Sequence, residues 1–179
     1  MAEGSAVSAA IGQSLSVAGL FAEREERRRR DHDAEEALKR KEREELAEFK
    51  KRLDTFQLTD DRIQAVLARI KGAFDRGESE LMLTSFPSSF CTDRGRAVNN
   101  ADAAPINKPK SGAAPDGERE PEWLATLPKG ARLVYEYWRA NLKPGGFGFS
   151  ARIINFPGGM PGDVGLFFSW PKSAMESAL

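Results

Sequence analysis

The stretch GFGFSARIINFPGGMPGDVGLFFSW, residues 146–170, is the densest apolar segment of the chain. Two runs of β-branched and aromatic residues, 147–156 and 163–170, flank a cluster of proline and glycine. This pattern is typical of two strands joined by a loop. The rest of the folded chain must therefore pack on this unit or shield it from water.

The first run alternates between apolar and polar side chains. Every second residue from Phe147 to Ile153 lies on one apolar side, and Ser150 and Arg152 lie on the other. The second side becomes apolar at Ile154 and Phe156. We therefore expect helices to cover one face of the sheet. At the end of this strand we expect a second cover, either helix 22–57 or a partner.

The segments before this unit predict an α+β fold. Residues 60–76 repeat apolar side chains at helical spacing, as do residues 130–142, and glycine follows each segment. Residues 80–86 form a third strand candidate that ends in Pro87. The predicted fold is a small antiparallel sheet of about three strands covered by these two helices, and a long charged helix precedes it.

The domain organisation follows from shifts in composition. We expect a flexible tail at 1–21, a charged helix at 22–57 and a tail at 173–179. One α+β domain is expected from 58–98 and 121–172. Residues 99–120 contain proline and glycine without an apolar period, which predicts a disordered linker or a surface excursion. A constant offset of seventy positions, for example between Phe86 and Phe156, suggests an internal repeat.

The charged helix ends in a short apolar seam at Leu46, Phe49, Leu53 and Phe56. Spacings of three and four residues resemble a heptad, so the seam is a candidate interaction surface for a protein partner or for self-association. The alternative is a solvated helix whose last turns pack on their own domain. The basic run 27–30 is surrounded by acidic residues, which offset its field. His32 has no catalytic or metal-binding partner in the pattern.

Composition narrows the function classes. With 27 basic and 27 acidic residues, the chain has no net charge to attract nucleic acid or an anionic membrane. One cysteine permits no internal disulfide and no cysteine-based zinc site, and it suits a cytoplasmic location. No apolar run is long enough to cross a bilayer. The sequence predicts no metal, no cofactor and no membrane partner.

The loop after Phe86 is the most site-like segment. Cys91 is a weak candidate nucleophile that Arg94 or Arg96 would activate, but a buried structural cysteine is the plainer interpretation. The two arginines are a candidate anion-binding pair. An ion pair between Asp93 and one of the arginines is expected to fix the turn. We also expect this loop to meet the loop 156–163.

No motif assembles a catalytic set, so an enzyme is not the favoured class. The favoured function is a non-catalytic protein-interaction or adaptor module that uses the charged helix and the sheet. One alternative is a nucleic-acid-binding module that uses Arg94, Arg96 and Arg152. The other is an enzyme with Cys91 as its nucleophile.

Overall fold

The structure is a computed structural model that describes residues 16–102 and 120–172. The chain divides into two units, residues 1–49 and residues 50–179, and each is considered by itself. The predicted tail 173–179 lies outside the described residues, as do residues 1–15 of the predicted N-terminal tail and residues 103–119 of the predicted linker.

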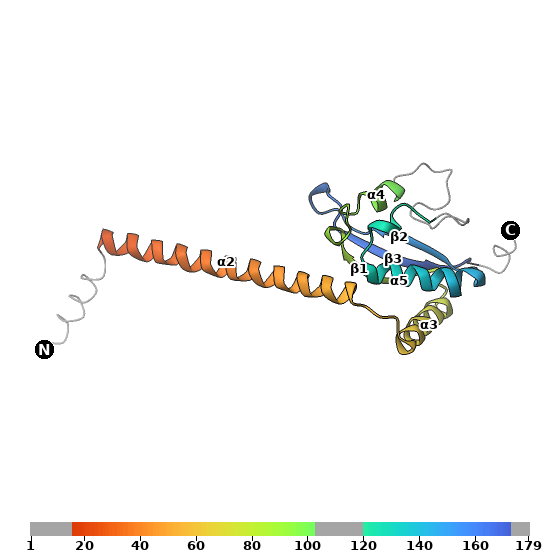
Figure 1. Ribbon diagram of the computed structural model, residues 1–179. Helices are drawn as coiled ribbons and strands as arrows, with labels where there is room; N and C mark the ends of the chain where they lie inside the picture. The colour runs from red at the N-terminus through yellow and green to blue at the C-terminus, as the bar shows by residue number, and fades with distance from the viewer. Residues whose placement is uncertain (1–15, 103–119, 173–179) are drawn as a thin grey trace, which may run out of the picture. The chain divides into compact units, whose positions relative to one another are not determined.

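Helix α2 (Val17–Asp54) makes up the described part of the first unit and ends in the second (Figure 1). It begins before the predicted boundary at residue 22, so residues 17–21 are helical and the expected tail is wrong there. The hydroxyl of Ser16 accepts a hydrogen bond of 3.0 Å from the amide of Gly19, which caps the helix at this point. The helix ends three residues before the predicted residue 57.

No residue of α2 is buried. Ion pairs one turn apart line the helix; Lys39 Nζ lies 2.7 Å from Glu35 Oε1 and 3.5 Å from Glu36 Oε1. Each exposed pair of this kind stabilises a helix by only about 0.2–0.5 kcal/mol. The sequence nevertheless supplies many such pairs together with strong helix formers, which keeps a solvated helix formed.

The sheet has the three predicted strands, β1 (Glu80–Pro87), β2 (Gly148–Ile153) and β3 (Asp163–Ser169). Their order is β1-β3-β2, and both pairings are antiparallel. The central strand β3 is therefore the second half of the apolar stretch 146–170. Phe149 pairs with Phe168 and Ile153 pairs with Val164, which places the alternating apolar residues of β2 and β3 on one face.

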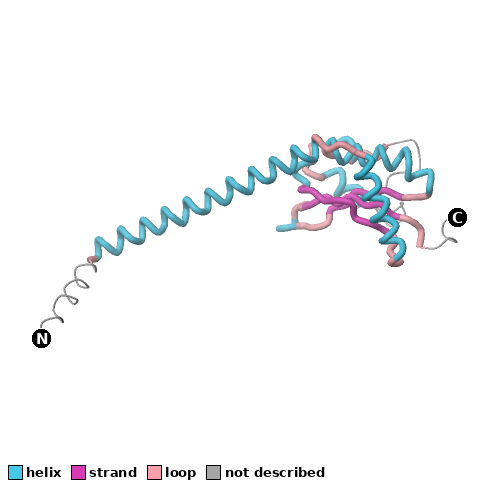
Figure 2. The backbone as a smooth tube through the Cα atoms, turned by 90° about the horizontal axis from the view of Figure 1, so that it is seen from below, coloured by secondary structure: helices cyan, strands magenta, loops and turns pink. Residues whose placement is uncertain are grey.

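Helices cover that face, as the sequence predicts. Figures 1 and 2 both show α5 (Lys129–Tyr137) against the sheet, and α3 (Asp60–Asp75) contacts β1. The guanidinium of Arg69 in α3 donates to the carbonyl of Met82 at 2.8 Å, which occupies a backbone acceptor of the edge strand β1. After Tyr137 the chain continues in a π-helical turn (Trp138–Leu142), and Gly146, at φ 87°, starts the approach to β2.

Phe149 is the centre of the core. It is 1% exposed, and its ring centroid lies between 5.6 and 6.1 Å from those of four other aromatic residues, Trp123, Tyr135, Trp138 and Phe168. The indole nitrogen of Trp138 donates to the carbonyl of Phe147 at 2.8 Å, so the polar edge of this buried ring has a partner. The cluster joins the segment at Trp123, helix α5 and the sheet.

Helix α4 (Arg96–Asp102) was not predicted. Its residues 99–102 fall in the segment predicted as a disordered linker or surface excursion, and they are helical. Val98 of α4 is 0% exposed. The backbone amides of Gly95 and Ala97 donate to the carboxylate of Asp93 at 3.0 and 2.6 Å, which fixes the start of this short helix.

The structure does not support the equivalence of Phe86 and Phe156 that the offset of seventy positions suggests. Phe86 is buried in β1, whereas Phe156 lies beyond the end of β2 and is 51% exposed. The two residues do not occupy equivalent places, which counts against a repeat with an offset of seventy. Ile154 is 40% exposed, and the expected cover at the end of this strand stays a prediction.

Candidate functional site

The two loops at the end of the sheet meet, as the sequence predicts. The amide of Ser88 donates to the carbonyl of Gly162 at 2.8 Å, and its hydroxyl donates to the carbonyl of Pro161 at 2.8 Å. Gly95, at φ 77°, packs beside them; a Cβ there would lie 2.9 Å from the Cβ of Ser88. Because Ser88 and Gly95 are both buried, this junction is packed and forms no open cleft at these residues.

Cys91 lies within this packed region and is 3% exposed. Burial, together with a smaller contribution from the nearby carboxylate of Asp93, raises the pKa of its thiol to about 12. A nucleophilic cysteine requires the opposite shift, because the thiolate is the reactive form. The geometry therefore favours a structural role for Cys91.

The candidate anion-binding arginines lie on a turn. The carboxylate of Asp93 accepts hydrogen bonds from backbone amides. Within residues 16–102 and 120–172 it forms no ion pair with either arginine, so the predicted ion pair is wrong. Arg94 takes a positive φ of 58°, and both Arg94 and Arg96 are exposed. Their guanidinium groups are accessible to an anion.

Arg152 does not join these two arginines. The side chain of Ile153 approaches Gly95 on the covered face of the sheet, and adjacent residues of a strand point to opposite faces. Arg152 therefore lies on the other face, where it donates to Glu80 at 2.8 Å. The three arginines of the predicted nucleic-acid site do not form one patch.

The face of the sheet opposite α5, here called the open face, is partly apolar. Met82 pairs with Phe167 across the strands and is 43% exposed. Ile154 and Phe167 both lie over Gly165; a Cβ at this glycine would come within 2.8 Å of the first and 2.7 Å of the second. The sequence shows the alternation that creates this face, but it does not show that the face stays uncovered.

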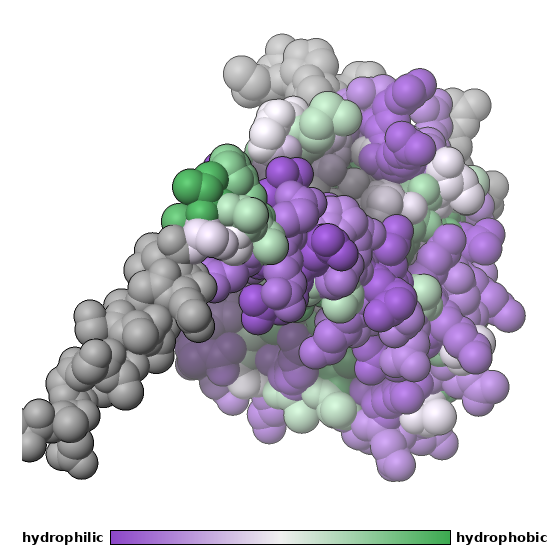
Figure 3. All heavy atoms as spheres, turned by 90° about the vertical axis from the view of Figure 1, so that its left-hand side faces the viewer, coloured by the Kyte–Doolittle hydropathy of each residue, from purple (hydrophilic) through white to green (hydrophobic). Residues whose placement is uncertain are grey.

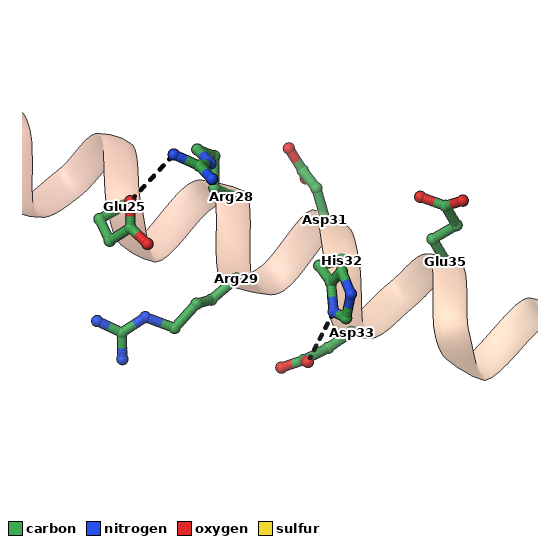
Figure 4. A pocket seen from close by; sticks show the side chains of 7 residues that line it. All are labelled: Glu25, Arg28, Arg29, Asp31, His32, Asp33 and Glu35. Atoms are coloured by element: carbon green, nitrogen blue, oxygen red, sulfur yellow. Dashed lines mark ion pairs between the residues drawn. The ribbon is translucent and has the colours of Figure 1, made fainter.

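On α2, side chains around His32 surround a shallow hollow (Figure 4). All its lining residues come from one exposed stretch of helix, Glu25 to Glu35. His32 Nδ1 lies 3.8 Å from Asp33. Within the described ranges, no group of three or more histidine, cysteine or acidic side chains could hold a metal ion.

The predicted interaction seam divides into two parts. Leu46 is 45% exposed and Phe49 is half-buried. Leu53 and Phe56 are half-buried beside α5; a Cβ at Gly130 would clash with the carbonyl of Leu53 and lie 2.9 Å from Phe56. The last turns of α2 thus pack on their own domain, as the alternative interpretation of the sequence expected, and the helix up to Leu46 is exposed.

The exposed region carries large apolar side chains, of which the predicted seam included only Leu46. Large apolar residues at 45–71% exposure occur at the start, middle and later part of α2; they are Val17, Leu20, Phe21, Leu38 and Leu46. Figure 3 shows a hydrophobic patch where the described part of the helix begins. At 100° per residue these five side chains fall within an arc of about 100°. The sequence carries a signal for this apolar side, because these residues share one side when the helical period is counted over the whole of α2.

Comparison with known proteins finds no matching family model, no matching curated protein and no matching solved structure. Among the described helices, none is both long and apolar enough to cross a membrane.

Proposed function

We propose that the chain is a non-catalytic protein-interaction module, in which α2 presents the main binding surface and the open face of the sheet presents a second one. The observation that carries this proposal is the exposure of α2. A helix of 38 residues has no buried residue, yet large apolar side chains share one side of it.

Exposed apolar side chains on one side of a helix have a physical consequence. Covering one large aliphatic or aromatic side chain contributes about 1.5–3 kcal/mol when it is fully removed from water. Leu20, Phe21 and Leu38 are 49–64% exposed, so a partner that covers them gains a substantial part of that amount. An amphipathic helix that lies in an apolar groove, or against another helix, is a common recognition mode.

The alternatives have less support. The raised pKa of the buried Cys91 thiol argues against a nucleophile. The separation of Arg152 from Arg94 and Arg96 argues against a single basic patch for nucleic acid. We also propose a cytoplasmic location, because the single cysteine forms no internal disulfide.

The test uses a photo-crosslinking amino acid in the full chain. One variant carries it at Leu38 on the apolar side of α2, and the matched control carries it at Ala37, which lies on the opposite side. We expect protein adducts from position 38 in cells that express the chain, and few from position 37. Equal labelling at both positions, or none at either, would show that α2 is only a solvated spacer.

A further inference from the structure

The apolar side chains of α2 share their side of the helix with an ordered set of charges. On the same arc of about 100°, here called the α2 stripe, the first half carries Arg24 and Arg28 and the second half carries Glu42. Asp31 and Lys39 lie at the edges of the stripe near the middle of the helix. All of these side chains are exposed.

This order of charges distinguishes the two ways in which α2 can pair with a copy of itself. A parallel pair in register places Arg24 and Arg28 against the same arginines, and it places Glu42 against Glu42. An antiparallel pair with full overlap places Arg28 opposite Glu42 of the second copy and Asp31 opposite Lys39 of the second copy. Each contact occurs twice because the pair is symmetric.

Phe21 and Leu46 also have suitable neighbours in this register. With the two helices centred on Glu35, Phe21 lies opposite Phe49 of the second copy, and Arg24 lies opposite Leu46. The aliphatic stem of an arginine can cover a leucine while its charged head stays in water. The two Glu35 carboxylates approach at the centre, but Lys39 Nζ, 2.7 Å from the carboxylate in its own helix, offsets that charge.

We propose that α2 binds α2 of a second copy of this chain in an antiparallel pair centred on Glu35. This inference rests on the proposed function and names its partner. It predicts that the full chain is a dimer whose contacts join the first half of one helix to the second half of the other.

The first test exchanges charges. Arg28→Glu alone and Glu42→Arg alone each place two like-charged pairs in the antiparallel register, so each variant should shift the dimer–monomer midpoint at least 10-fold toward higher concentration in analytical ultracentrifugation. The double variant with both changes restores opposite charges and should return to the wild-type midpoint. In a parallel pair the double variant would gain nothing. The control Arg30→Glu changes the charge on the opposite side of the helix and should leave the midpoint unchanged.

The second test measures distance with a single nitroxide label in each copy. A label at Ala22 sits 13 residues from the centre, so two copies should place their labels about 39 Å apart along the axis in an antiparallel pair. A label at Ala37 should give about 6 Å along the axis plus the width of two helices. Both sites face away from the stripe. The only native cysteine, Cys91, is buried, and a Cys91→Ala background removes it.

The distances and the oligomeric state together test the antiparallel pair. A dimer with long Ala22 and short Ala37 distances supports the proposal. A dimer with short distances at both sites is parallel and overturns it. A chain that stays monomeric at millimolar concentration also overturns it. Photo-crosslinks from Leu38 to a different protein would then still support the proposed function, and the absence of both would reject the two together.

Discussion

The guanidinium carbon of Arg152 lies 3.8 Å from the centre of the Phe167 ring on the open face of the sheet. The same guanidinium donates to Glu80 at 2.8 Å, and its Nε is buried without a hydrogen-bond partner in the described residues. Arg152 thus joins strand β2 to both other strands, and its guanidinium covers the ring of Phe167. A flat guanidinium can stack and donate at once, whereas an ammonium group cannot.

We therefore expect Arg152→Lys to lower the free energy of unfolding by about 1 kcal/mol, because the stacked geometry is lost. In a double-mutant cycle with Phe167→Leu, the coupling energy should be about 0.5–1 kcal/mol. The control is Arg139→Lys, since Arg139 forms an exposed ion pair with Glu120 at 3.0 Å and the substitution should change stability little. A coupling energy near zero would show that the Arg152–Phe167 contact contributes nothing.

Gly130 is placed where the end of α2 meets the start of α5. A Cβ at this position would clash with the carbonyl of Leu53, which is backbone and cannot rotate away. We expect Gly130→Ala to destabilise the domain by about 1–3 kcal/mol in chemical denaturation, the range for overpacking a buried contact.

Gly72 in α3 is the matched control for Gly130. Its nearest neighbour would be the far end of the flexible Arg76 side chain at 3.4 Å, so Gly72→Ala should stabilise by about 0.5–1 kcal/mol through helix propensity. The two substitutions should therefore have opposite signs. If Gly130→Ala also stabilised the chain, the close packing of Leu53 on α5 would be wrong.

Local patterns predicted the α+β fold, the three strands and the two covering helices. The alternation in 147–153 and the helical period in 60–76 are patterns of neighbouring residues, and the structure has a strand and a helix at these places. Helix α4 gave no such signal, because it is short and depends on the Asp93 carboxylate and the burial of Val98. The start of α2 was missed because residues 17–22 lack the charges that mark the rest of that helix.

The candidate site was less predictable, because it depends on which segments meet. The sequence placed Arg94, Arg96 and Arg152 in one hypothetical patch, yet the alternation of β2 sends Arg152 to the other face. The sequence also grouped Leu53 and Phe56 with the interaction seam, whereas both residues pack against Gly130 inside the domain. A sequence can identify candidate functional residues, but the tertiary structure decides which of them lie together.

The buried thiol of Cys91 predicts a pH dependence. Its pKa is raised from 9.0 to about 12 by burial. Below pH 9 the thiol is protonated in both folded and unfolded chains. Above pH 9 the unfolded chain loses this proton and the folded chain keeps it, so stability falls as pH rises toward 12.

The measurement is the difference in unfolding free energy between the wild type and Cys91→Ala. Taking the difference cancels the lysine and tyrosine titrations that both chains share. The difference should be constant from pH 6 to 8 and should decline between pH 9 and 11. In the folded wild type, a thiol reagent at pH 8 should react at least 100-fold more slowly than in the denatured chain. Rapid reaction of the folded chain would show that Cys91 is accessible after all.

Phe149 and Phe156 belong to the same apolar run, but the first is buried and the second is exposed, so their substitutions should affect stability differently. Phe149 is 1% exposed and touches four aromatic rings, so Phe149→Ala should lower the free energy of unfolding by about 3–5 kcal/mol. Phe156 is 51% exposed beyond the end of β2, and Phe156→Ala should change it by less than about 0.5 kcal/mol. Urea unfolding followed by tryptophan fluorescence measures both, since Trp123 and Trp138 lie against Phe149. A large loss for Phe156→Ala would mean that this side chain is covered in solution.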